Sequence, residues 1–161
     1  MFKILAVLSL IVGAAAAKCG SSSCGRAGRK PVRFPMVDKF FVLIVGLSLA
    51  VLALTGFYAL LFGHPLSGYV LICHTGAGGA FAGSLAVLAV LRAEAEIGAG
   101  RFLFWALLIG GLGVVLTAVV MMQPWFGTHG QEVLVDLHRC SSFLAVIGGI
   151  GCCGSLLLEK S

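Results

Sequence analysis

The sequence predicts an all-α integral membrane protein, a four-helix up-and-down bundle with an additional short N-terminal hydrophobic segment. Hydrophobic residues make up 60% of the 161 positions and charged residues 11%, whereas soluble domains carry about 25% charged residues. Four runs without Asp, Glu, Lys or Arg are long enough, at about 20 residues, to cross a bilayer. Short connections between successive runs are typical of antiparallel neighbours. This composition excludes both a soluble domain and a disordered chain.

The chain divides into an N-terminal hydrophobic segment at 1–18, a basic loop at 19–39 and a four-helix domain at 40–158. The first segment, MFKILAVLSLIVGAAAAK, has the basic start, the short apolar stretch and the Ala-x-Ala end of a secretory signal peptide. A retained anchor or a short fifth helix remains an equally open interpretation of this segment.

The uncharged runs that define the helices are 40–63, 68–91, 102–123 and 140–158. The sequence HPLS joins the first two runs, and so short a turn permits only an antiparallel hairpin. We expect the fourth helix to extend upstream as an amphipathic turn that contains His138 and Arg139.

The formal net charge of +5 indicates membrane topology rather than nucleic-acid binding, because the basic residues cluster beside apolar runs. The segments 18–39 and 92–101 carry most of the Lys and Arg, so the positive-inside rule assigns them to the cytoplasm. The opposite loops, 64–67 and 124–137, carry only the acids Glu132 and Asp136, and we expect these loops to face outward. A translocated signal at 1–18 would invert this orientation.

Two histidines fall at the same predicted depth in the bundle, and ionisable residues inside a membrane are costly enough to suggest a function. His74 lies six residues into the second predicted helix, and His138 lies at the start of the fourth, which runs in the same direction. Neutral imidazole is a good axial ligand for haem iron. Two such side chains at one level can ligate one haem from opposite faces.

The neighbours of these histidines fit a flat cofactor. Gly78 follows His74 by one helical turn and Ser142 follows His138 by the same interval, so small residues share the faces of both imidazoles. Arg139, at the membrane surface, is a candidate partner for a haem propionate.

Simpler interpretations of the histidines stay open. His74 can be a buried imidazole hydrogen-bonded to a neighbouring helix, and His138 a surface residue at a helix start. His64 and His129 fall in the external loops, where they are solvated residues, contacts to a partner, or groups that assist proton exchange at a quinone pocket. The acids Glu132 and Asp136 could relay protons there, or simply favour a helix start.

Glycine and cysteine give weaker signals. The 23 glycines include GAGG at 76–79, GG at 110–111 and GGIG at 148–151, for which close helix packing is the simplest explanation. Cys19 and Cys24 make at most half of a zinc or iron-sulfur ligand set, or a disulfide. The other cysteines, Cys73, Cys140, Cys152 and Cys153, are expected to behave as small hydrophobic residues.

The stretches VRFPMVDKFFVLIVGLSLAVLALTGFY, GYVLICHTGAGGAF and VLVDLHRCSSFLAV resemble the bacterial membrane-bound cytochrome b superfamily over about residues 31–158. That superfamily includes the membrane subunits of formate dehydrogenases and nickel-iron hydrogenases and related small di-haem cytochromes. The matching motifs are Arg-Phe before the first helix, Thr55-Gly56, His74 and His138-Arg139. The resemblance implies that His74 and His138 are axial ligands of haem b.

One position departs from the family pattern. Family members commonly carry a His near the start of the first helix, where this chain has Val42. The resemblance therefore implies one haem b on the external side rather than two.

These observations predict an electron-transfer subunit, more an accessory of an oxidoreductase than an enzyme itself. It would be a multi-pass protein of the bacterial inner membrane that binds lipid and a quinone. It would work in a larger respiratory or photosynthetic complex with cytochrome c or iron-sulfur subunits, and no nucleic acid is expected as partner. The alternatives are a haem-free structural subunit that retains the cytochrome b bundle and, with less support, a small transporter.

Overall fold

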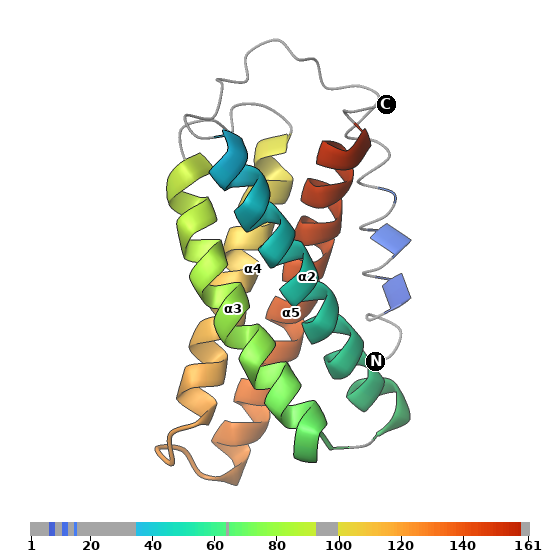
Figure 1. Ribbon diagram of the computed structural model, residues 1–161. Coiled ribbons are helices and arrows are strands. Elements are labelled where there is room, and N and C mark those ends of the chain that lie inside the picture. Colours follow the sequence, from blue (N-terminus) through green and yellow to red (C-terminus); the bar gives the residue numbers. More distant parts are fainter. Residues whose placement is uncertain are drawn as a thin grey trace.

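The protein is all-α, and its four long apolar helices pack as two hairpins in a membrane-type bundle (Figure 1). The structure, a computed structural model, describes residues 35–63, 65–92 and 100–158, together with residues 7, 8, 11, 12 and 15 near the N-terminus. The helices are α2 (Pro35–Phe62), α3 (Gly68–Arg92), α4 (Gly100–Met121) and α5 (Thr128–Leu158). This confirms the predicted fold class and a multi-pass membrane protein with four candidate spans.

Two helix starts differ from the sequence prediction. Helix α2 begins at Pro35, inside the segment that was expected to be loop, and a proline in the first turn costs the helix no hydrogen bond. Helix α5 begins at Thr128, so most of the expected external loop at 124–137 is helical. Its 31 residues span about 46 Å at 1.5 Å per residue, which exceeds the roughly 30 Å hydrocarbon core. Apolar runs predict the part inside the bilayer and miss helical turns beyond it.

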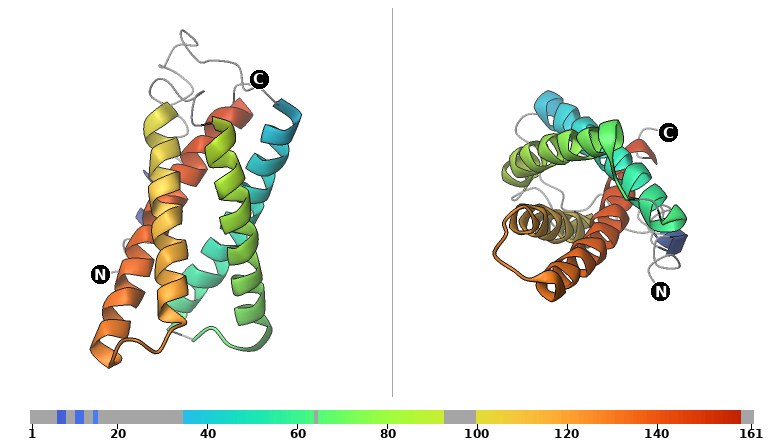
Figure 2. Two further views of the ribbon diagram at one scale, coloured as in Figure 1. Left: turned by 90° about the vertical axis from the view of Figure 1, so that its left-hand side faces the viewer. Right: turned by 90° about the horizontal axis from the view of Figure 1, so that it is seen from below.

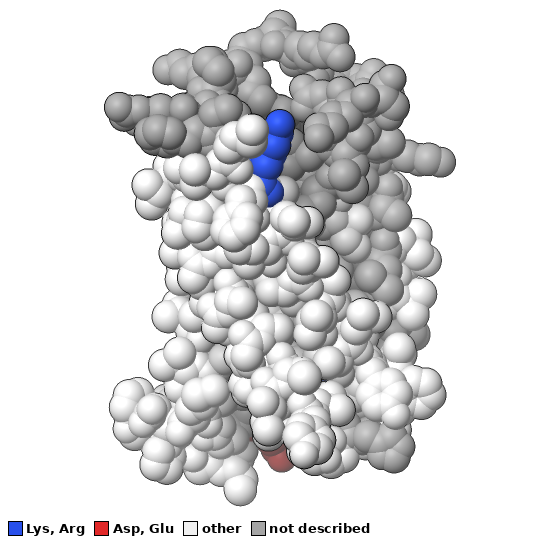
Figure 3. Space-filling view, viewed as in Figure 1, with Lys and Arg blue, Asp and Glu red and all other residues white. Residues whose placement is uncertain are grey.

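The connections between helices are grouped at the ends of the bundle as predicted. The α2–α3 and α4–α5 connections lie together at the lower end of Figure 1, and the other helix ends lie at the upper end. In Figure 3, charged atoms on the visible face lie near the two ends, and the surface between them is uncharged. Exposed aromatic side chains mark both ends, as expected for residues at membrane interfaces. They are Tyr58, Tyr69, Trp125 and Phe126 at the lower end and Phe40, Phe102 and Trp105 at the upper end.

A buried ion pair joins the upper ends of α2 and α3. The Arg92 guanidinium donates from Nε to one carboxylate oxygen of Asp38 at 2.6 Å and from Nη2 to the other at 2.7 Å. Both residues are only 5% exposed. Asp38 lies in the first turn of its helix and Arg92 in the last turn of its own, where each charge complements the helix dipole.

Glycine brings α4 and α5 into backbone contact. A Cβ at Gly110 would lie 2.5 Å from the backbone nitrogen of Ala145, and one at Gly148 would overlap the backbone nitrogen of Leu107. These two helices form the most extensive contact of the bundle, while the two hairpins meet each other over smaller areas. Close packing is thus confirmed for GG at 110–111 and for GGIG at 148–151. For GAGG at 76–79 the expectation is wrong, because a Cβ at Gly76 or Gly79 would meet no atom within 4 Å and one at Gly78 only Leu52 Cδ2 at 4.0 Å.

The hairpins meet through two reciprocal contacts that relate them by an approximate two-fold axis. Leu49 of α2 fills the space that a side chain at Gly149 of α5 would need, and Leu85 of α3 does the same at Gly111 of α4. Leu49 precedes Thr55 by the same interval as Gly111 precedes Thr117, and Leu85 follows His74 by the same interval as Gly149 follows His138. Equivalent positions therefore make equivalent contacts, as two-fold symmetry requires. The two views of Figure 2 show the hairpins side by side.

Candidate functional site

The candidate site is formed by His74 and His138, one from each hairpin. His74 is the seventh residue of α3 and His138 the eleventh of α5, and both imidazoles are half-buried. Both helices run upward from the lower end of the bundle in Figure 1, so both histidines lie in its lower half. The expectation that His138 starts its helix is wrong, because α5 already runs for about three turns before it.

Each histidine is held by a threonine on the preceding helix of its own hairpin. The Nδ1 atom of His74 lies 2.7 Å from Thr55 Oγ1, and Nδ1 of His138 lies 2.9 Å from Thr117 Oγ1. Thr55 belongs to the Thr-Gly pair noted in the sequence, and a Cβ at Gly56 would lie 3.6 Å from Cε1 of His74. That distance is an ordinary van der Waals contact, so Gly56 lies directly beside the imidazole.

The other ring nitrogen of each histidine borders open space. Neither Nε2 atom has a hydrogen bond among those of the described residues, where no fully buried side-chain nitrogen or oxygen lacks a partner. Both Nε2 atoms are therefore accessible.

The small residues predicted beside the histidines are present at these helix faces. Gly78 is half-buried, and a Cβ there would meet only Leu52 Cδ2, at 4.0 Å. The Ser142 hydroxyl donates to the backbone oxygen of His138 at 2.8 Å. Its single proton is used inside the helix, so Ser142 offers a small surface rather than a donor to any ligand.

The bundle is closed on one side of the site and open on the other. Between α2 and α5, the Phe57 and Phe143 rings are in contact with centroids 5.7 Å apart. The two-fold equivalents of these residues are Val119 of α4 and Gly79 of α3. Val119 is 54% exposed, and nothing lies within 4 Å of a Cβ at Gly79. At this level the α3–α4 edge, which faces the viewer in the left view of Figure 2, is therefore open, with exposed residues where α2 and α5 have a ring contact.

Arg139 lies on the outer side of the site, next to His138. Its Nη1 atom donates to Asp136 Oδ1 at 3.0 Å, and the two side chains are 41% and 54% exposed. Both residues line a surface hollow of about 390 Å³ with Gln131, Glu132 and Val135. The two acids expected in an external loop therefore share one helical hollow with the arginine, and neither lies in the first turn of α5.

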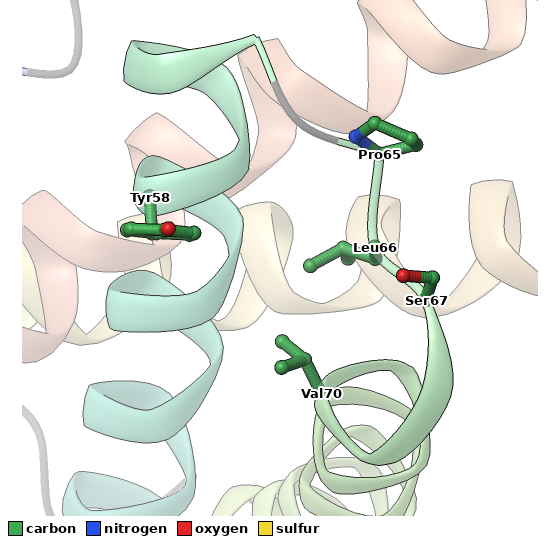
Figure 4. Close-up of a pocket in the computed structure, with 5 residues that line it drawn as sticks. All are labelled: Tyr58, Pro65, Leu66, Ser67 and Val70. Atoms are coloured by element: carbon green, nitrogen blue, oxygen red, sulfur yellow. The ribbon is translucent and has the colours of Figure 1, made fainter.

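A second hollow, of about 480 Å³, lies at the α2–α3 turn. Figure 4 shows Tyr58 on α2 and the side chains of Leu66 and Val70 directed toward the space between the two segments. Pro65 and Ser67 complete the lining, and neither site histidine takes part.

The remaining predicted candidates do not join the site. His129 is exposed near the start of α5. Cys73 and Cys140 are exposed free thiols, and Cys152 is buried. Predictions for His64, Cys19 and Cys24, for the side chain of Cys153, and for most of residues 1–18 fall outside the described residues.

Comparison with protein-family models, with curated proteins and with solved structures finds no match to this chain.

Sequence reasoning missed Thr117. The signal that could have found it is the internal repeat, because a Thr precedes a His at nearly the same interval in both halves: Thr55 before His74 and Thr117 before His138. In an antiparallel hairpin, such spacing places both side chains at the same height on facing helices.

Proposed function

We propose that the chain is a membrane cytochrome b subunit, in which His74 and His138 hold a single b-type haem. The subunit transfers electrons between the quinone pool and an external redox partner, within a larger respiratory or photosynthetic complex of the bacterial inner membrane. The observation that carries the proposal is the pairing of two histidines from different hairpins in one half of the bundle, each with an accessible Nε2. The resemblance to the cytochrome b superfamily supports it.

The donor set fits haem better than a bare metal ion. Among the described residues, no group of three or more His, Cys, Asp or Glu is arranged to hold a metal. Two imidazoles suffice for haem, because the macrocycle supplies the in-plane ligands. The small residues Gly78 and Ser142 keep bulky side chains away from the helix faces beside the two imidazoles, and Gly79 adds an exposed position without a side chain at the α3–α4 edge.

The protein's own residues would supply ligation, orientation and burial, and bound haem would supply one-electron transfer. His74 and His138 ligate through Nε2. Arg139 lies at the outer surface, where a propionate would be neutralised. The acids that we propose to exchange protons with a quinone are Glu132 and Asp136, because both line the hollow beside Arg139.

A reduced-minus-oxidised absorption spectrum of the full chain, purified with haem supplied during expression, tests this function. We expect a b-type α-band with one haem per chain. His74→Ala and His138→Ala should each abolish it, whereas His129→Ala should retain it, because His129 is exposed and outside the site. A featureless spectrum from folded protein would instead identify a haem-free structural subunit, and two haems per chain would refute the single-haem proposal.

A further inference from the structure

We infer that Thr55 and Thr117 are equivalent positioning residues, each of which fixes its histidine in the tautomer that carries the proton on Nδ1. Nε2 is then the ligating nitrogen of both imidazoles. The identity of the ligand as haem rests on the proposed function, whereas the tautomer follows from the hydrogen bonds of the protein alone.

The direction of each hydrogen bond follows from the single proton of a hydroxyl group. Thr55 Oγ1 lies 2.7 Å from the backbone oxygen of Val51, and Thr117 Oγ1 lies 2.7 Å from that of Gly113. A carbonyl oxygen has no proton to give, so the hydroxyl proton must lie between the two oxygens; without it, two acceptors would repel each other at this distance. Each hydroxyl is thereby left only as an acceptor toward the imidazole.

The imidazoles must therefore donate. His74 donates from Nδ1 to Thr55 Oγ1, and His138 donates from Nδ1 to Thr117 Oγ1. A neutral imidazole has one N–H, so in each ring the Nε2 atom carries the lone pair.

Both Nε2 atoms are accessible, as the ligating nitrogens of a metal centre must be. Histidines that ligate metals commonly donate their second ring nitrogen to an acceptor, which fixes the ring and raises its basicity as a ligand. Here that acceptor is supplied twice, at positions related by the two-fold repeat, so the two ligands are matched.

A purely structural role of the hydroxyl groups does not explain why Thr55 and Thr117 are each paired with a histidine. Thr75, Ser48 and Ser84 also donate to carbonyl oxygens of their own helices, at 3.0, 2.6 and 2.6 Å. Bonds of this kind satisfy hydroxyl groups throughout membrane helices. Among the described residues, only Thr55 and Thr117 also accept from a histidine. Thr75, which is exposed and adjacent to His74, is the matched control.

Imidazole ¹⁵N NMR on haem-free, histidine-labelled protein in detergent tests the tautomer directly. We expect wild-type His74 and His138 to carry the proton on Nδ1. Thr55→Val should release only His74 and Thr117→Val only His138, each toward the Nε2–H form. Thr55→Ser, Thr117→Ser and Thr75→Val should leave the wild-type pattern. Protonated Nε2 in the wild type, or valine variants with unchanged tautomers, would overturn the inference.

The haem-loaded protein gives a second readout. Loss of the acceptor makes the imidazole a weaker donor to the oxidised iron, so each valine variant should raise the midpoint potential, and each serine variant should keep the wild-type value.

The two proposals fail separately. A wild type without a b-type spectrum refutes the proposed function while NMR still decides the tautomer. An α-band that needs both histidines, with tautomers and potential unaffected by valine, refutes only the role of the threonines.

Discussion

In the hairpin α4–α5 the two helices are in backbone contact at glycines, whereas in the hairpin α2–α3 the equivalent positions carry side chains. Gly110 and Gly148 bring the backbones of α4 and α5 together. The two-fold equivalents of these residues are Ser48 and Ser84, both buried and both bonded to their own helices. Each serine adds a side chain where the second hairpin has none, and α2 and α3 pack less extensively than α4 and α5.

The first hairpin also has a buried ion pair. The Asp38–Arg92 pair ties its upper end, and the position equivalent to Asp38 in the second hairpin is Gly100. One framework for a Thr–His pair can thus be stabilised by backbone contact along its length or by a charge pair at its end. The two mechanisms make different predictions.

Breaking the ion pair should have the largest effect. Asp38→Asn removes the carboxylate that accepts both of these guanidinium hydrogen bonds, and breaking a buried ion pair typically costs about 3 to 5 kcal/mol. The free energy of unfolding in mixed detergent micelles measures this loss. Asp136→Asn, which removes an exposed carboxylate from Arg139, should change it by no more than about 0.5 kcal/mol. Equal effects of the two substitutions would show that burial does not determine the strength of these pairs.

Adding a methyl group to α5 should have the next largest effect. Gly148→Ala places a Cβ against the backbone of Leu107, and such overpacking costs about 1 to 3 kcal/mol. Gly79→Ala is the matched control, because no atom lies within 4 Å of its Cβ position. Alanine there should leave stability unchanged or raise it by at most about 1 kcal/mol through helix propensity. The same measurement of the free energy of unfolding tests both substitutions. A loss of stability in Gly79→Ala would contradict the prediction, because it would mean that the added methyl group meets another residue at the open α3–α4 edge.

The reciprocal contacts between the hairpins should give the smallest effect, measured as a coupling energy. Leu49→Ala removes a side chain from the core, and Gly149→Ala crowds the same side chain. The double variant relieves the crowding, so its loss should fall short of the sum of the single losses by about 1 kcal/mol. Strict additivity would mean that Leu49 and Gly149 do not share one space.

The sequence was sufficient to predict the four helices and the pair of histidines in one half of the bundle. Both predictions rest on desolvation, which makes charged residues rare inside a bilayer and leaves His74 and His138 conspicuous. The upstream start of α5 was missed because a helix that projects into water is no longer constrained by hydropathy.

Contacts between distant residues were beyond the sequence pattern. Asp38 and Arg92 counted only as loop charges, since nothing local indicates that residues 54 positions apart meet. The glycines were recognised as a class, yet Gly110 contacts backbone while Gly79 faces open space. Whether a glycine faces another helix or open space depends on the rotation of its helix about its own axis. The sequence does not specify that rotation, because all faces of these spans are apolar.

The reciprocal Leu and Gly contacts determine which hairpins can pair. The first hairpin carries both leucines, Leu49 and Leu85, and the second carries both glycines, Gly111 and Gly149. Two copies of the first hairpin would set leucine against leucine, and two copies of the second would leave voids. During synthesis, the hairpin that enters the membrane first is therefore a poor match for its copy in a neighbouring chain. It finds a complementary surface only when the second half of its own chain arrives.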